Sequence, residues 1–411
     1  MGLGRNFLWQ FLGQGVAKGL GLLFYLLLPR LTGLEIYGQF TFALSLSLMI
    51  LQPLLELGLD LVITKGVSRD RSQQHPVVIQ DALLIRGGMA VLCLALLPLL
   101  ARLGTPFTLL ASLYLYLVLL SMQRLCFAVQ RGYEQMRLEA VVTSLHKGLA
   151  LVLLLGLGWA TFPRLWLGPI ALVVATAIAT FITLLFTWPY LQPSVGQSVQ
   201  IPRLKQTATE GVLLGGVALL GMLYFRIDSV MLGIIEGDAA VGLYNAAYRL
   251  VEGAIMLPSV IMIVAFPRLA QPQQFRAMFQ KLLALLGGLG VLVSLAMVWA
   301  APALMTLIYT ADFQGAIPIM QLLSLCLLPI YLGHLATQSL VALERQKLYL
   351  LLTLAAVVVN IALNAGLIPL YGAQGAAIAT LITESLIMLG CFAGVGRRWA
   401  KVLTDESKSV S

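Results

Sequence analysis

The sequence predicts an all-α polytopic membrane protein with about twelve transmembrane helices. Of its 411 residues, 60% are hydrophobic and only 10% are charged, and the mean hydropathy is +0.93. A soluble domain carries about 25% charged residues, so a water-soluble fold is excluded. Each membrane-spanning helix needs about 20 apolar residues, and the chain divides almost entirely into segments of that kind.

Hydropathy windows of about 19 residues give the order of the spans. The first span contains Gln10, Gln14 and Lys18 and ends in no small-residue cleavage site, so we interpret it as a retained helix and not as a signal peptide. Connectors rich in lysine and arginine follow every second span. The predicted spans are 8–28, 37–61, 82–101, 105–128, 140–160, 166–188, 208–232, 241–266, 279–299, 317–342, 348–369 and 374–395.

The distribution of the basic residues predicts the orientation of these spans. A net charge of +9, from 26 basic and 17 acidic residues, is also typical of proteins that bind nucleic acid. Here, however, twenty basic residues fall on one side of the membrane, and only Arg30, Arg102 and Arg164 fall in connectors on the other. Cytoplasmic loops retain lysine and arginine, so both termini are predicted to be cytoplasmic. The charge indicates membrane orientation, and no nucleic-acid partner is expected.

A polar connector and an internal repeat divide the chain into two halves. The connector runs from Pro189 to Gln206, which predicts a six-helix lobe at 1–195 and a second at 196–411 with a short cytoplasmic tail. Between the first two helices of each half, Gly33 and Gly38 align with Gly237 and Gly242. Because six is even, the halves share one orientation. Such a parallel repeat predicts two lobes around a central cavity, with substrate at their interface.

Cationic side chains inside the spans are the first candidate site. An ionisable group in lipid costs about 2.5–3.5 kcal/mol and usually faces the bundle interior or a water-filled cavity. Lys18 follows Gln14 at the spacing of one helical turn, and Arg226 and Arg249 lie at similar predicted depth in the seventh and eighth spans. Asn245 and Tyr248 accompany Arg249. We predict that these residues line a cationic cavity.

A structural role is the alternative for the same cations. In this interpretation, Lys18 pairs with a carboxylate of another helix, and the pair only holds the two helices together. Asp228 with Arg249, or Arg249 with Glu252, are able to neutralise each other. The sequence leaves both interpretations open.

Acidic and amide groups form a second candidate site, for ion coupling. Glu384 lies near mid-depth of the last span, and Asn360 and Asn364 stack one turn apart on the eleventh. Together they are candidates to bind H⁺ or Na⁺, and Asp228 and Glu252 are weaker candidates because arginines lie near them in sequence. Interhelical hydrogen bonding, worth about 0.6 kcal/mol per bond, is the alternative.

Enzymatic signatures are missing from the sequence. There is no Walker-type phosphate loop, no His-Glu-Xaa-Xaa-His pair and no extramembrane stretch long enough for a nucleotide-sugar domain. Cys93, Cys126, Cys326 and Cys391 lie in apolar stretches without metal-ligand spacing, which is typical of buried thiols. We expect a transporter that is not an enzyme and has no cofactor, catalytic residue or metal.

Several short motifs resemble those of bacterial polysaccharide-repeat (O-antigen/exopolysaccharide, Wzx-type) flippases, which belong to the multidrug/oligosaccharidyl-lipid/polysaccharide exporter superfamily. The resemblance covers nearly the whole chain and is diagnostic through the combination of its motifs. They are Asn6-Phe-Leu-Trp9, Pro29-Arg-Leu, Tyr37-Gly-Gln-Phe40, Leu57-Gly-Leu, Arg226-Ile-Asp228, Val241-Gly-Leu-Tyr-Asn-Ala-Ala-Tyr-Arg249, Phe266-Pro-Arg268, Asn360 to Asn364, Ile368-Pro, Gly372 and Gly375-Ala-Ala-Ile-Ala-Thr-Leu.

The resemblance implies a flippase of the bacterial inner membrane. It would move a polyprenyl-diphosphate-linked oligosaccharide from the cytoplasmic to the external leaflet by alternating access. The sugar-diphosphate head group would meet cationic residues, a role that fits Lys18, Arg226 and Arg249. Expected partners are therefore the lipid-linked glycan and membrane lipid, with a polysaccharide polymerase as a further candidate.

Two alternatives remain open at the level of sequence. Cation-coupled multidrug antiporters of the same superfamily also have twelve spans, but they favour acidic cavities, whereas this chain carries net basic groups. A polytopic membrane enzyme that acts on lipid-linked sugars is the third hypothesis.

Overall fold

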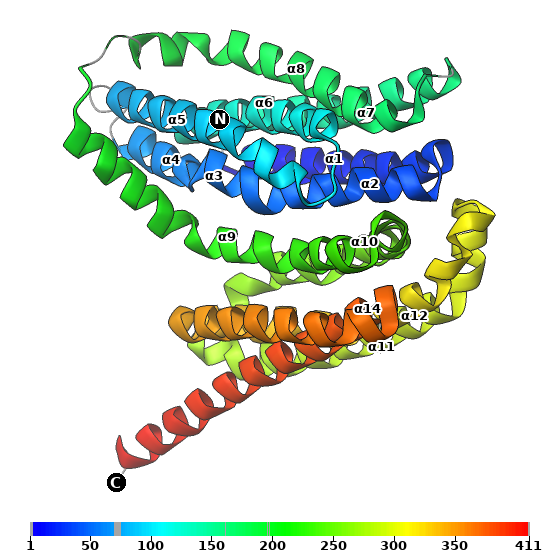
Figure 1. Cartoon of the computed structure of the whole chain (residues 1–411). Helices are drawn as coiled ribbons and strands as arrows, with labels where there is room; N and C mark the ends of the chain where they lie inside the picture. The colour runs from blue at the N-terminus through cyan, green and yellow to red at the C-terminus, as the bar shows by residue number, and fades with distance from the viewer. Residues whose placement is uncertain (1–2, 70–74, 161, 195, 197, 410–411) are drawn as a thin grey trace. The chain divides into compact units, whose positions relative to one another are not determined.

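The computed structural model describes residues 3–69, 75–160, 162–194, 196 and 198–409 (Figure 1). All the regular elements in these ranges are helices, so the predicted all-α class is confirmed. In chain order they are α1 (Leu3–Thr32), α2 (Leu34–Leu46), the π-helix η1 (Ser47–Leu51), α3 (Gln52–Glu56), α4 (Leu59–Arg69), α5 (His75–Ala101), α6 (Phe107–Gly132), α7 (Met136–Trp159), α8 (Arg164–Leu191), η2 (Gln192–Ser194), α9 (Ile201–Glu236), α10 (Asp238–Leu269), α11 (Pro272–Ile308), η3 (Ala311–Ala316), α12 (Ile317–Leu325), α13 (Leu327–Ala342) and α14 (Gln346–Ser409).

The helices correspond in order to the twelve predicted spans. Ten segments of the described chain are long and apolar enough to cross a membrane, and Ile201–Gly216 with Leu220–Glu236 makes an eleventh across a 64° bend. The last of the ten, Gln346–Gly396, has 51 residues. At about 1.5 Å per residue, a straight helix of that length is more than twice the roughly 30 Å hydrocarbon core. It therefore corresponds to the last two predicted spans.

Gly372 divides α14 into these two spans. Its φ of 56° and ψ of −136° are not helical, and this combination is open to glycine but strained for residues with a Cβ atom. The helices on either side pack against each other in antiparallel fashion. Methyl groups added at glycines of the second part would meet side chains or backbone of the first, in the pairs Gly375 with Leu367, Gly390 with Leu352 and Gly394 with Leu348. Each pair is equidistant from position 371, as a tight hairpin requires.

The second span, predicted as one segment over 37–61, is broken and continues to Arg69. After the π-helix η1, Leu57 adopts a left-handed conformation with φ 43°, and Gly58 follows with φ 67°. The backbone of α9 lies directly against this break. A methyl group at Gly58 would overlap the carbonyl oxygen of Gly211 and lie 2.6 Å from Gly215 Cα. Gly58 is therefore required both by its conformation and by the close approach of a neighbouring helix.

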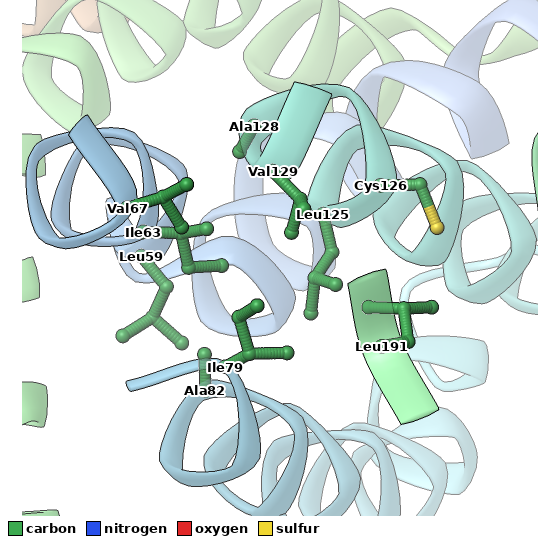
Figure 2. Close-up of a cluster of buried hydrophobic side chains, with 10 residues drawn as sticks. All are labelled: Leu59, Ile63, Val67, Ile79, Ala82, Leu125, Cys126, Ala128, Val129 and Leu191. Atoms are coloured by element: carbon green, nitrogen blue, oxygen red, sulfur yellow. The ribbon is translucent and has the colours of Figure 1, made fainter. Parts of the chain in front are cut away.

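The cytoplasmic end predicted for the first half contains a closely packed apolar core (Figure 2). Three helices contribute most of it, because α4, α5 and α6 each present apolar residues at intervals of three or four to the others. All four cysteines of the chain are buried and free, as predicted, and Cys126 is part of this core. The cluster consists of Leu59, Ile63, Val67, Ile79, Ala82, Leu125, Cys126, Ala128, Val129 and Leu191.

The chain forms two compact units, Met1–Val230 and Met231–Ser411. The boundary between them lies within α9. The lobe limits at 195 and 196 stay a prediction.

The two glycines of the first pair in the predicted repeat, one in each unit, have the same backbone conformation. Gly33 has φ 84° and ψ 171°, and Gly237 has φ 86° and ψ −175°, each as the residue that precedes a helix, α2 or α10. Eight residues later, Thr41 and Asn245 each donate a side-chain hydrogen bond to the carbonyl four residues before them, at 2.9 and 3.1 Å. The backbone thus has the register that the glycines indicate in the sequence.

A second repeated feature joins α6 to α7 and α13 to α14. Glu134 and Glu344 have φ of 60° and 59°, which is uncommon for a residue other than glycine. Around each glutamate the backbone amides close the two hydrogen bonds of a Schellman motif. Sequence reasoning missed this match because neither motif has glycine at the left-handed position, where glycine usually marks it.

Candidate functional site

The polar stripe predicted on α1 divides between two environments. Gln10 donates hydrogen bonds to Glu139 Oε2 at 2.9 Å and to the Met136 carbonyl at 3.4 Å, so it joins α1 to α7. Gln14 is half-buried, whereas Lys18 is exposed. Lys18 is therefore the residue of this stripe that is accessible to a ligand.

Arg226 and Asp228 lie on the segment of α9 after its bend. Arg226 is half-buried and Asp228 is buried. The charge of Arg226 acts on the Tyr116 hydroxyl of α6, and so do the charges of Arg124 and Glu56. Arg226 and Arg124 thus act electrostatically on the same tyrosine.

Arg249 forms one of the structural pairs considered from the sequence. Its Nη1 donates to Glu252 Oε2 at 2.6 Å. The guanidinium is nearly buried, with 9% of the side chain exposed, whereas the Glu252 side chain is 40% exposed. Glu252 thus has the more accessible position in this pair.

Asn245 and Tyr248 lie on the same helix, α10, with different surroundings. Asn245 is buried and bonds to the backbone of its own helix. Tyr248 stacks on Tyr244 with ring centroids 6.1 Å apart, and the Tyr244 hydroxyl lies 3.3 Å from Thr380 Oγ1 on α14. A stacked, half-buried tyrosine presents both an apolar face and a hydroxyl to a ligand.

The amide pair proposed for ion coupling is buried and in direct contact. Asn364 Nδ2 donates to both the carbonyl and the Oδ1 of Asn360, each at 3.0 Å. Their side-chain oxygens are neutral acceptors of the kind that a desolvated cation accepts as ligands. Glu384 lies on the second part of α14 and is half-buried.

Sequence reasoning missed four arginine–carboxylate pairs in the first compact unit, Met1–Val230, called unit 1 below. It did not identify partners for Glu56 and Asp60, which lie four residues apart in the second predicted span. Their spacing is visible in the sequence, whereas their arginine partners on α6 and α5 depend on how the helices pack. The pairs are Arg124 with Glu56, Arg86 with Asp60, Arg131 with Glu139 and Arg203 with Asp81.

The pairs have a clear physical basis. Asp81 is fully buried and accepts two hydrogen bonds from Arg203, at 2.7 and 3.0 Å, and one from Thr207 at 3.5 Å. A buried carboxylate without such partners would carry a desolvation cost of several kcal/mol, of the order found for other buried ions. Paired in this way, these groups join α9 to α5 and the other helices to one another.

The fold and these charged groups are those of a multi-pass helical membrane protein with two units and cationic groups within its spans. Residues 3–273 match the model of the family described as polysaccharide biosynthesis protein. The match covers more than half of the chain, which therefore belongs to this family, and the predicted resemblance is confirmed.

One curated relative and two solved structures are similar to this chain. The relative is the probable flippase AglR of Haloferax volcanii, 26% identical over 173 residues, which are 40% of this chain and 36% of the relative. The chain thus matches about a third of that relative's length.

The two structures share the fold at low identity. The lipid II flippase MurJ in an inward closed conformation has a TM-score of 0.75 with 13% identity, over 95% of this chain and 87% of that chain. An inward-facing transporter of the multidrug resistance MATE family, from the MOP superfamily, has a TM-score of 0.74 with 15% identity, over 94% and 95% of the two chains. The matched proteins are transporters and flippases, which agrees with the prediction that the chain is not an enzyme.

Proposed function

We propose that the protein is a flippase that moves polyprenyl-diphosphate-linked oligosaccharide repeat units from the cytoplasmic to the external leaflet by alternating access. The observation that carries this proposal is the family match to polysaccharide biosynthesis proteins in a chain with the fold of a flippase. A transporter in a glycan pathway has a lipid-linked sugar as its natural cargo, because that intermediate is made on one leaflet and used on the other.

The proposed roles of the site residues follow from their chemistry. Lys18, Arg226 and Arg249 supply positive charge for the diphosphate of the head group. Gln14, Asn245 and Tyr248 supply hydrogen bonds and, for the tyrosine, a face on which sugar is able to stack. Charge-assisted hydrogen bonds to phosphate are about twice as strong as neutral ones, so the three cations contribute most of the head-group affinity.

Energy coupling is proposed at the buried amide pair and its neighbourhood. Asn360, Asn364 and Glu384 are the primary candidates to bind H⁺ or Na⁺. Asp228 and Glu252 are secondary, and the ion pair of Glu252 with Arg249 is consistent with that ranking.

Depletion in the native host tests the function. Labelled lipid-linked sugar is expected to accumulate on the cytoplasmic leaflet, and the wild-type gene is expected to restore export. A variant with Ala at Lys18, Arg226 and Arg249 should insert normally but restore less than a tenth of export. Normal leaflet distribution after depletion would exclude the proposed function, and full rescue by the triple variant would exclude the proposed site.

The runner-up is a cation-coupled multidrug antiporter, and the similarity to the MATE transporter supports keeping it. The same depletion strain separates the two functions, because loss of an antiporter causes drug hypersensitivity while leaving lipid-linked sugar normally distributed. The third hypothesis, a membrane enzyme, is not retained because the matched proteins are flippases and transporters.

A further inference from the structure

The four arginine–carboxylate pairs of unit 1 differ in how completely the guanidinium is used. In three of them at least two nitrogens are engaged. Arg131 contacts Glu139 through Nε and Nη2, and Arg203 contacts Asp81 through the same two atoms. Arg86 uses Nη1 on Ser121 and Nη2 on Asp60, with only 6% of its side chain exposed. Each of these three arginines thus has two of its three guanidinium nitrogens on protein acceptors.

Arg124 is different. Within the part of the chain that the structure describes, it contacts acceptors through Nη1 alone, which lies 2.6 and 2.8 Å from the two carboxylate oxygens of Glu56. Its side chain is 35% exposed. Nε and Nη2 together carry three N–H donors, and these are available to a ligand. Arg124 and Arg131 are the most exposed of the four arginines, at 35% and 37%, and Arg124 leaves two guanidinium nitrogens without an acceptor among the described residues, whereas Arg131 leaves one.

The partner of Arg124 lies at the break in the second span. Glu56 is the last residue of α3, immediately before the left-handed Leu57, and its side chain is 13% exposed. Gln52 Nε2 also donates to Glu56 Oε1 at 3.0 Å. The carboxylate thus keeps a neutral hydrogen-bond donor when the arginine is removed from it, which lowers the cost of separating the ion pair.

A second guanidinium, that of Arg226, acts electrostatically on the same tyrosine of α6 as this pair does. Tyr116 is two turns before Arg124 on α6, and its hydroxyl is under the combined influence of Arg124, Arg226 and Glu56. Two arginines and one carboxylate give this region a formal charge of +1. An anion that carries two or more negative charges is attracted to both arginines and repelled by Glu56.

We infer that Arg124 is a further ligand for the diphosphate of the substrate, and that Glu56 is its exchangeable counter-ion. The inference rests on the proposed function, because it takes the diphosphate of a lipid-linked sugar as the anion. Nε and Nη2 form a planar fork that matches two oxygens of one phosphate. Glu56 holds the fork in position in the absence of substrate and competes with the phosphate for it.

This arrangement predicts opposite effects from the two partners of one ion pair. Neutralising Glu56 removes a competitor and a repelling charge, so affinity for diphosphate should rise. Neutralising Arg124 removes a ligand, so affinity should fall. A purely structural pair predicts the same sign for both variants, because each leaves an uncompensated charge and weakens the fold.

Titration calorimetry of the full-length protein in lipid nanodiscs tests the inference, with farnesyl diphosphate as the probe. We expect Glu56→Gln to bind at least threefold more tightly than the wild type, Arg124→Gln at least tenfold more weakly, and Arg124→Lys to be intermediate. Lys65→Gln is the matched control, because it removes one cation from an exposed 3.9 Å pair with Glu210. Its affinity should equal that of the wild type. Thermal unfolding of each variant verifies that the protein compared is folded.

The outcomes separate this inference from the proposed function. If wild-type protein binds no farnesyl diphosphate, both fail. If it binds the diphosphate while Arg124→Gln binds equally well, or while Glu56→Gln binds more weakly, only the role of Arg124 is overturned. Inorganic pyrophosphate and farnesyl monophosphate identify the recognised group. If pyrophosphate competes with farnesyl diphosphate and farnesyl monophosphate does not, the site recognises the diphosphate. If farnesyl monophosphate binds as tightly as farnesyl diphosphate, recognition of the diphosphate is contradicted.

Discussion

At the scale of single residues, the structure separates polar groups by the use made of them. Arg86, Arg131 and Arg203 each have two of three guanidinium nitrogens on protein acceptors, whereas Arg124 has one. A sequence records only that each is a basic residue in or near the end of a predicted span. The distances between helices determine which N–H donors find an acceptor. These distances depend on helix packing, which a hydropathy window does not describe.

One residue-scale prediction concerns Glu384. The change Glu384→Gln keeps the volume and removes the titratable charge, so insertion should be preserved while any ion dependence of transport is abolished. Transport by reconstituted protein under imposed pH and sodium gradients is the measurement, and Glu344→Gln, on an exposed loop, is the control. A Glu384→Gln protein with the wild-type response to both gradients would exclude this residue from coupling.

At the scale of elements, the spans were predictable and their interruptions were not. Runs of apolar residues predict helices well, because lipid requires every backbone hydrogen bond to be satisfied within the segment. The break at Leu57 and Gly58 lies inside such a run, and the backbone at Gly58 packs directly against Gly211 and Gly215 of α9. Hydropathy has no term for that contact, so the span was expected to be continuous.

The hairpin at Gly372 gives an element-scale prediction. Any residue with a Cβ atom is strained at φ 56° and ψ −136°, by about 1–3 kcal/mol, so Gly372→Ala should lower the thermal stability of the detergent-solubilised protein. Gly366→Ala is the control, because a methyl group there meets open space and glycine in a helix is less favourable than alanine. Equal melting temperatures for the two variants would show that the turn is not constrained as described.

At the scale of the whole molecule, the polytopic class and the family followed from the sequence. The composition and the combination of motifs were sufficient for both. The candidate site was predictable only as a set of residue types. Arg249 and Glu252 could be paired from their spacing on one helix, whereas Arg124 and Glu56, on the fourth and second spans, could not.

The orientation of the molecule gives the third prediction. A cysteine at Asp312, which is exposed in η3, should react with a membrane-impermeant maleimide added outside intact cells. A cysteine at Lys205 should react only after the membrane is permeabilised, because the basic connectors are proposed to be cytoplasmic. The native cysteines are buried, so the unmodified protein provides the background. Labelling of position 205 in intact cells together with protection of position 312 would reverse the orientation.

The glutamates in the two Schellman motifs carry a consequence for the ancestry of the chain. A left-handed turn built on glutamate is the less favourable choice, because glycine adopts the same conformation without strain. Its presence at equivalent loops of both units, beside the matched Gly33 and Gly237, is what duplication of a six-helix gene leaves behind. Since such a duplication, the two halves would have kept these backbone turns while their charged residues diverged.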